Sequence, residues 1–220
     1  MLRRTWLSIV TLAIVAPMGA NGGSLMAQEA NPAHVHVLHV TEAFGATPDG
    51  SGLLPMAIAE ATIVAEHARL AGEGDPTDID PMIRHARHVL NAIDPGEFPT
   101  GPGLDFGVRP AAEGIIRHIE LAANSEGASQ SVVTHSAHVA AASSDLVQRA
   151  DEMVALARQV LAAGVYNVAY PLAQQLGSLG AELLTGADTS GDGSISMGDG
   201  EAGLGQVERH MALLVEAEGV

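Results

Sequence analysis

The residues best suited to bind a cation lie in a short stretch near the C-terminus, between Asp188 and Glu201. Its fourteen residues, DTSGDGSISMGDGE, include four carboxylates and four glycines. Oxygen atoms on alternate residues of a tight turn can surround Ca2+, which takes about six to eight of them. We take Asp188 as the first residue of a twelve-residue calcium-binding loop. The predicted calcium ligands are then Asp188, Ser190, Asp192, Ser194 through its backbone carbonyl, Ser196 and Asp199. Glu201 is the alternative last ligand if the loop is longer than about twelve residues.

This spacing resembles an EF-hand loop, and with an aspartate in the twelfth position it is similar to the loops of dockerin modules. Gly193 stands in the sixth position, where the turn needs a positive φ, and Ile195 in the eighth. The resemblance implies one calcium ion held between two helices, with the modest affinity of about 10⁻⁴–10⁻³ M typical of extracellular modules. The alternative interpretation is an acidic, glycine-rich surface turn that binds no ion.

The chain also has ten histidines, and four of them form the pairs His85-x-x-His88 and His135-x-x-His138. Residues three apart on a helix are neighbours, so each pair can bind one metal ion, and imidazoles suit zinc, copper or nickel. A single histidine precedes each pair, by eighteen residues in the first case and seventeen in the second. The spacing predicts two similar helical hairpins, each with one histidine on its first helix and a pair on its second.

The predicted transition-metal ligands are therefore His67, His85, His88, His118, His135 and His138. His34 and His36 are further candidates, on a segment that we expect to be irregular or extended. The alternative is that these histidines are structural. Arg84 and Arg87 flank the first pair and would oppose a cation, and His67 would then be a hydrogen-bonded core residue.

Residues 1–27 have the pattern of a secretory signal peptide. Arg3 and Arg4 precede an apolar run at 6–16, and small residues lead to a cleavage site after Ala27. The pattern predicts a periplasmic or secreted protein, with an uncleaved N-terminal anchor as the alternative. Because the chain has no cysteine, disulfides and lipid attachment through a cysteine are excluded.

The net charge and amino-acid composition indicate the fold class and the kind of partner. The formal net charge of −16 disfavours binding to nucleic acid and attracts cations, so metal ions are the expected partners. Aromatic residues make up 3% of the chain, while alanine and aliphatic residues are abundant, which favours closely packed helices over sheets. A protein partner cannot be named from the sequence.

Apolar spacing predicts an all-α fold: an alanine-rich bundle of five or six helices with a C-terminal EF-hand-like helix-loop-helix. The expected helices cover 53–72, 79–93, 110–124, 129–163, 166–184 and 202–217. The predicted organisation is the signal peptide at 1–27, an irregular histidine-containing segment at 28–52, a histidine-rich bundle at 53–165 and the EF-hand-like unit at 166–220.

The sequence contains no recognisable catalytic motif, and we predict no catalytic residue. The favoured hypothesis is a secreted or periplasmic metal-binding protein, with calcium in the loop and copper, zinc or nickel on the histidines. The alternative is a structural or protein-interaction module in which calcium is a staple and the histidines are structural. A metalloenzyme is the third hypothesis, and it would require a metal with an open position and a substrate cleft.

Overall fold

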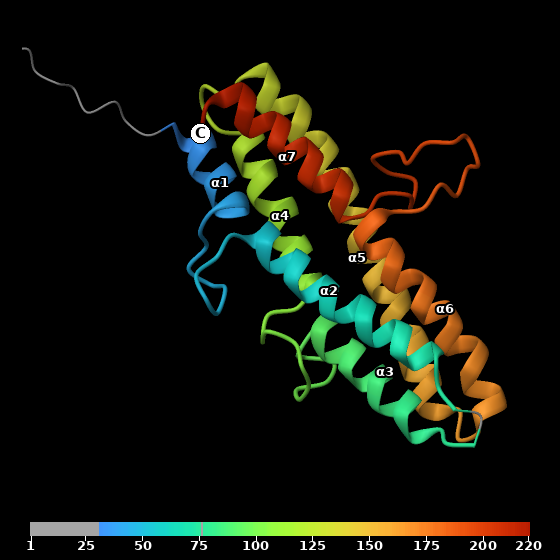
Figure 1. Ribbon diagram of the computed structural model, residues 1–220. Coiled ribbons are helices and arrows are strands. Elements are labelled where there is room, and N and C mark those ends of the chain that lie inside the picture. The colour runs from blue at the N-terminus through green and yellow to red at the C-terminus, as the bar shows by residue number, and fades with distance from the viewer. Residues whose placement is uncertain (1–30, 76) are drawn as a thin grey trace, which may run out of the picture.

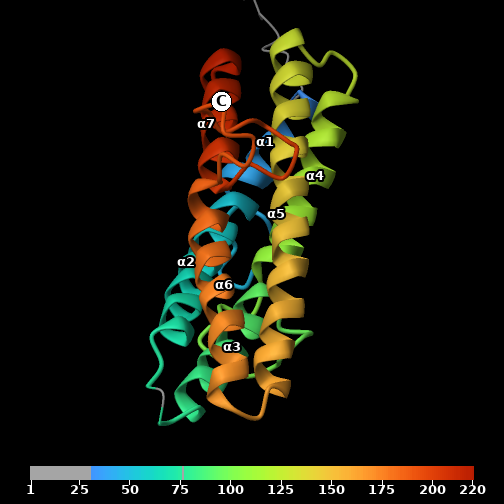
Figure 2. The ribbon, with the colours of Figure 1, turned by 90° about the vertical axis from the view of Figure 1, so that its right-hand side faces the viewer.

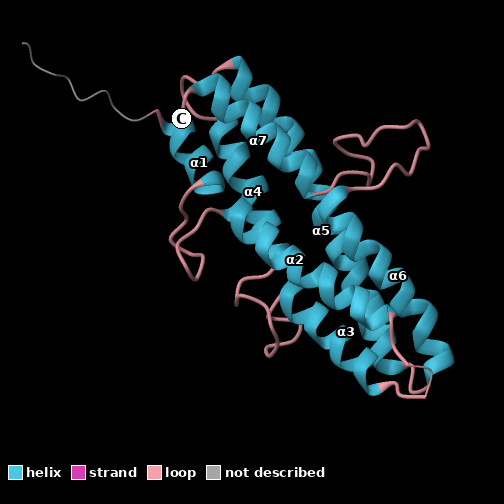
Figure 3. Cartoon of the chain, in the orientation of Figure 1, coloured by secondary structure: helices cyan, strands magenta, loops and turns pink. Residues whose placement is uncertain are grey.

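The computed structural model describes residues 31–75 and 77–220, so the predicted signal peptide lies outside the described residues. The described part has seven α-helices and no strand, which confirms the all-α prediction (Figure 3). The helices are α1 (Pro32–Thr41), α2 (Leu53–Gly72), α3 (Asp80–Ile93), α4 (Val108–Ala123), α5 (Gln130–Ala162), α6 (Tyr166–Thr185) and α7 (Leu204–Glu218). Six of them begin and end within two residues of the predicted bounds.

The remaining helix, α1, contradicts the expectation that residues 28–52 are irregular. The side chain of Asn31 caps this helix by accepting the N–H of Ala33 at 3.0 Å, and a proline occupies its first turn. Ala33, Val37 and Val40 form its buried stripe. The stripe covers fewer than three turns and is rich in valine, which has a low helix propensity, so the local pattern alone does not predict it.

The helices form an elongated bundle in which α5 runs the whole length (Figures 1 and 2). Helices α1, α4 and α7 lie at one end of the bundle, and α3 and α6 lie at the other. The 33 residues of α5 continue unbroken, which corresponds to a length of about 50 Å. Among the described helices, none has the length and apolar character needed to cross a membrane.

Small residues allow helices α2 and α6 to pack closely. A Cβ atom added at Gly180 would lie 2.8 Å from the Cβ of Ala68, closer than two carbon atoms can pack. The core itself consists largely of alanine, valine and leucine. The scarcity of aromatic residues therefore corresponds to short distances between helices, as the composition indicated.

A buried carboxylate holds the loop between α3 and α4. Glu60 of α2 is fully buried, and its Oε1 accepts the backbone N–H groups of Leu104 at 2.9 Å, Phe106 at 3.2 Å and Gly107 at 2.8 Å. Burial raises the pKa of Glu60, and this effect outweighs the opposite effect of the three amides. The contacts fix the point at which α4 begins against α2.

Candidate metal centres

Nine of the ten histidines gather in three groups of three, in which the ligand nitrogens all lie within 4.8 Å of one another. The groups are His36, His39 and His118, the α1–α4 triad; His67, His85 and His88, the α2–α3 triad; and His135, His138 and His210, the α5–α7 triad. Each triad combines a His-x-x-His pair on one helix with a single histidine on a neighbouring helix. The same arrangement therefore occurs three times in one chain.

In the α1–α4 triad the single histidine faces both members of the pair. The Nδ1 of His118 lies 3.1 Å from the Nδ1 of His36 and 3.3 Å from the Nδ1 of His39. The ring of Phe44 packs edge-on against His118, with its centroid at 5.0 Å, and so covers part of the triad. The three imidazoles thus turn their Nδ1 atoms toward a common point beside an aromatic ring.

The α5–α7 triad repeats this geometry. The Nδ1 of His210 lies 3.1 Å from the Nδ1 of His135 and 3.3 Å from the Nδ1 of His138. Both distances equal those of the α1–α4 triad, although the helices involved differ in length and in their place in the bundle. Two unrelated helix pairs therefore arrive at the same arrangement of donors.

The α2–α3 triad is the third case. The Nδ1 of His67 lies 2.9 Å from the Nδ1 of His85, and the rings of His67 and His88 have centroids 4.6 Å apart. The Nδ1 of His88 is buried and has no hydrogen-bond partner in the described chain. A buried ring nitrogen without a partner is costly, and a metal ion would satisfy it.

Nitrogen atoms at these distances must share a proton or a cation. One N–H can reach two acceptors only as a weak, bifurcated bond, whereas a metal ion accepts the lone pairs of all three rings. In a tetrahedral site with metal–nitrogen bonds of about 2.0–2.1 Å, ligand atoms lie about 3.3–3.4 Å apart. The separations of 2.9–3.3 Å in the triads are close to that spacing.

The positions of the histidines follow from the helical period. The residue after every triad histidine is buried: Val37, Val40, Ala68, Ala86, Val89, Ile119, Ser136, Val139 and Met211. Consecutive residues on a helix point about 100° apart, so each histidine lies at the edge of a buried face. All nine are partly buried as a result, with the ring at the seam between two helices.

The surroundings favour the neutral form of six of these imidazoles, in which burial lowers the pKa. Burial, together with the neighbouring His88 and His85, lowers the pKa of His67 to about 4. Burial is also the main cause of the lowered pKa values of His85, His88, His118 and His210. A neutral imidazole is the form that binds a metal ion.

The structure brings together half of the predicted histidine set as expected. His67 lies with His85 and His88, as the first predicted hairpin required. In the second hairpin α4 packs on α5 with His118 on the first helix and the pair on the second, but His118 turns toward α1 and meets neither His135 nor His138. Of the further candidates on α1, which is helical rather than extended, His36 belongs to a triad, whereas His34 contacts Glu218, Nε2 to Oε2, at 3.0 Å.

Sequence reasoning missed the pair on α1 and the single His210 on α7. A signal for the pair was available, because the pattern His-x-x-His-Val occurs three times: at 36–40, 85–89 and 135–139. The last valine of each copy is fully buried. No comparable pattern marks His210, whose role depends on the packing of α7 against α5.

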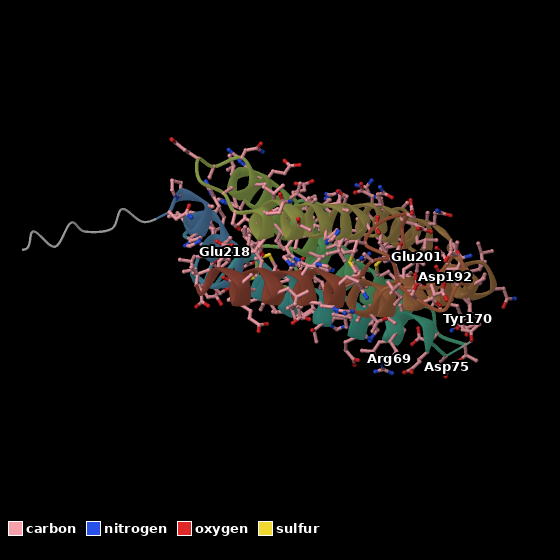
Figure 4. The ribbon with its side chains drawn as sticks, turned by 90° about the horizontal axis from the view of Figure 1, so that it is seen from above. Arg69, Asp75, Tyr170, Asp192, Glu201 and Glu218 are labelled. Atoms are coloured by element: carbon pink, nitrogen blue, oxygen red, sulfur yellow. The ribbon has the colours of Figure 1, made fainter. Side chains whose placement is uncertain are left out.

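The loop between α6 and α7 turns Glu201 inward and leaves Asp199 outside (Figure 4 labels Glu201 and Asp192). Glu201 is 2% exposed, and its two carboxylate oxygens accept the N–H groups of Ser190 at 2.8 Å and Ser196 at 2.9 Å. These bonds lower the pKa of Glu201 to about 2. Asp199 is exposed and has a φ of 60°. Of the two residues that could close the loop, Glu201 faces its interior.

The other acidic side chains of the loop accept hydrogen bonds from the loop itself. Asp188 accepts the backbone N–H groups of Gly191 at 2.7 Å and Gly193 at 2.8 Å, and Asp192 accepts the N–H of Ser194 at 2.8 Å. The hydroxyl of Ser196, another predicted ligand, donates to the carbonyl of Gly198 at 2.8 Å. In the described chain, the loop carboxylates form no group of three within 4.8 Å, in contrast to the triads.

Two buried charged residues of α5 attach the end of this loop to the bundle. Arg149, 6% exposed, donates to the carbonyls of Ala202 at 2.6 Å and Gly200 at 2.7 Å. Asp145, 5% exposed, accepts the N–H of Ala202 at 3.0 Å. This clamp sets the start of α7 against α5, and therefore the place of the helix that carries His210.

The chain matches no known protein family, no curated protein and no solved structure. Its sites are therefore interpreted from their own chemistry.

Proposed function

We propose that the protein binds transition-metal ions at three tri-histidine sites. The observation that carries this proposal is the threefold recurrence of a His-x-x-His pair facing one further histidine, with Nδ1 atoms 2.9–3.3 Å apart. Nitrogen donors without cysteine suit zinc, copper(II) or nickel rather than calcium or magnesium. The acidic surface would raise the local concentration of any of these cations.

Storage or carriage of metal fits the arrangement better than catalysis. Four hollows on the described surface have volumes of 240–390 Å³, and no triad histidine lines any of these four. A catalytic metal needs a cleft that holds a substrate beside it. Three similar sites on one chain instead multiply its capacity for one kind of ion.

The number of bound ions tests this proposal. We expect about three equivalents of zinc per chain by equilibrium dialysis, with one equivalent lost in each of His67→Gln, His118→Gln and His210→Gln. The matched control is His34→Gln, because His34 is the one histidine outside the triads. Unchanged stoichiometry in the three variants, or no zinc uptake by the native chain, would contradict the proposal.

For the loop between α6 and α7 we propose calcium binding, with Glu201 rather than Asp199 as the last ligand. The inward position of Glu201 and the φ of 88° at Gly193, the sixth position, support this assignment. Calorimetric titration of chelator-treated protein should detect one calcium site that is lost in Asp192→Ala. Heat that persists in the variant, or no heat in the native protein, would indicate an acidic turn instead.

A periplasmic or secreted location stays a prediction, because it rests on residues 1–27. The competing function is a structural or protein-interaction module in which calcium is a staple. The two functions differ in what the histidines do: the module would take up no transition metal, and its triads would be packing groups. The zinc titration therefore separates them without knowledge of a protein partner.

A further inference from the structure

The arginines of the described chain fall into two sets. Arg69, Arg109, Arg149 and Arg158 form ion pairs with carboxylates. Four others have no carboxylate within 4.0 Å anywhere in residues 31–75 and 77–220: Arg84, Arg87, Arg117 and Arg209. Each of these four is exposed, and each directly precedes a triad histidine. Every triad therefore has at least one unpaired arginine beside it.

This placement is unexpected for a site that binds only a cation. The chain has 26 acidic residues, so carboxylates are available to pair with these arginines or to join the triads. In the described residues no carboxylate belongs to any triad. Positive charge beside a divalent cation weakens its binding unless a negative group lies between them.

The arginines are near enough to act on the triads. Arg84 lies four residues before His88 on α3, and residues at that spacing are neighbours on the helix surface. Of the remaining three, Arg87 lies over the ring of Phe98, with its Cζ 5.9 Å from the ring centroid. Arg117 and Arg209 are adjacent to His118 and His210 on the same helix.

Three neutral imidazoles leave a divalent ion with its full charge and with a fourth position open. We propose that each triad binds its metal together with a small oxyanion, which fills this position and pairs with the neighbouring arginine. A guanidinium group and a metal ion both bind oxyanions well, and the anion would separate the two positive charges. The inference rests on the proposed function, and it adds the class of the fourth ligand.

Cobalt(II) is a suitable probe, because its visible absorption reports the ligands around it. We would titrate the full chain with cobalt at constant ionic strength, in perchlorate and with part of the perchlorate replaced by phosphate or, separately, by bicarbonate. We expect several-fold tighter cobalt binding and a changed spectrum with one of these oxyanions, at one anion per metal. The arm with the larger effect identifies the preferred anion.

The variant Arg84→Gln/Arg117→Gln/Arg209→Gln should keep three cobalt ions and lose the effect of the oxyanion. The matched control is Arg158→Gln, which removes an exposed arginine paired with Glu97 and should keep that effect. Because all proteins are compared in the same solutions, binding of cobalt to free phosphate cancels from the comparison.

The outcomes separate this inference from the function on which it rests. Equal oxyanion effects in the native chain and the triple variant, with cobalt bound more tightly by the variant, would mean that the arginines only repel the cation. That result overturns the oxyanion and leaves the metal sites in place. Absence of cobalt binding in every solution overturns both.

Discussion

The histidine triads and the loop at 188–201 gather candidate ligands in opposite ways. The triads draw nitrogen atoms from residues up to 82 positions apart, whereas the loop draws oxygen atoms from fourteen consecutive residues. In the triads the Nδ1 atoms face one another. In the loop, the carboxylates of Asp188, Asp192 and Glu201 accept backbone N–H groups of the loop.

The difference indicates which of the two regions a bound cation would stabilise more. The loop satisfies its acidic oxygens internally, so calcium must compete with hydrogen bonds that already exist. In a triad of neutral rings, one Nδ1–H can serve two facing nitrogens only as a weak, bifurcated bond, whereas a metal ion accepts the lone pairs of all three rings. We therefore expect a transition metal to stabilise the protein more than calcium does.

The largest expected effect is stabilisation by zinc. At a free concentration one hundred times Kd, each occupied site adds about 2.7 kcal/mol to the free energy of unfolding, or roughly 8 kcal/mol for three independent sites. Thermal unfolding with and without a chelator would measure this change. His118→Gln should lose about a third of this zinc-dependent stabilisation. A melting temperature that does not depend on zinc would contradict the expectation that a transition metal stabilises the protein more than calcium does.

The next largest effect is expected from loss of the clamp, in which Arg149 and Asp145 of α5 hold the end of the loop. Arg149→Met should lower the free energy of unfolding by about 2–3 kcal/mol, because it leaves the carbonyls of Ala202 and Gly200 without their donor. Urea unfolding would measure the loss, with Arg158→Met as the exposed control, expected to change stability by about 0.5 kcal/mol or less. Zinc affinity should fall at the α5–α7 triad and stay constant at the α2–α3 triad. A uniform decrease at both triads would contradict a local effect.

Calcium should have a smaller effect. At ten times Kd it would add about 1.4 kcal/mol to the free energy of unfolding. We expect Glu201→Gln to abolish this calcium-dependent increase and Asp199→Asn to retain it, because Glu201 alone of the two faces the loop interior. The melting temperature with and without calcium measures both variants. The reverse pattern would assign the closing ligand to Asp199.

The last expected effect is a pH dependence of the metal-free protein. Between about pH 6.5 and pH 4 the unfolded chain binds a proton at His67 more readily than the folded chain, whose His67 has a pKa lowered to about 4. Stability should therefore fall as the pH decreases through this range. His67→Gln should reduce the slope in urea unfolding at several pH values. A slope that remains unchanged would mean that His67 is protonated equally in both states.

Local patterns predicted most of the fold because they depend on neighbouring residues. The apolar stripe from Met82 to Ile93 predicted α3, and the spacing of acids and glycines after Asp188 located the loop. Helix α1 was missed because its stripe is short and its valines favour other conformations. The inward turn of Glu201 depends on hydrogen bonds across the loop, and so the sequence left Asp199 and Glu201 as alternatives.

The sequence by itself determined which histidines share a helix face, because the period of the α-helix places residues three apart side by side. The sequence already grouped His67 with His85 and His88, whereas the tertiary structure alone decided which third histidine completes the other two pairs. His118 precedes the pair on α5 by seventeen residues, and it meets His36 because α1 packs on that face of α4. Such a choice depends on the packing of whole helices, which buries the residues next to the histidines and so brings distant rings together.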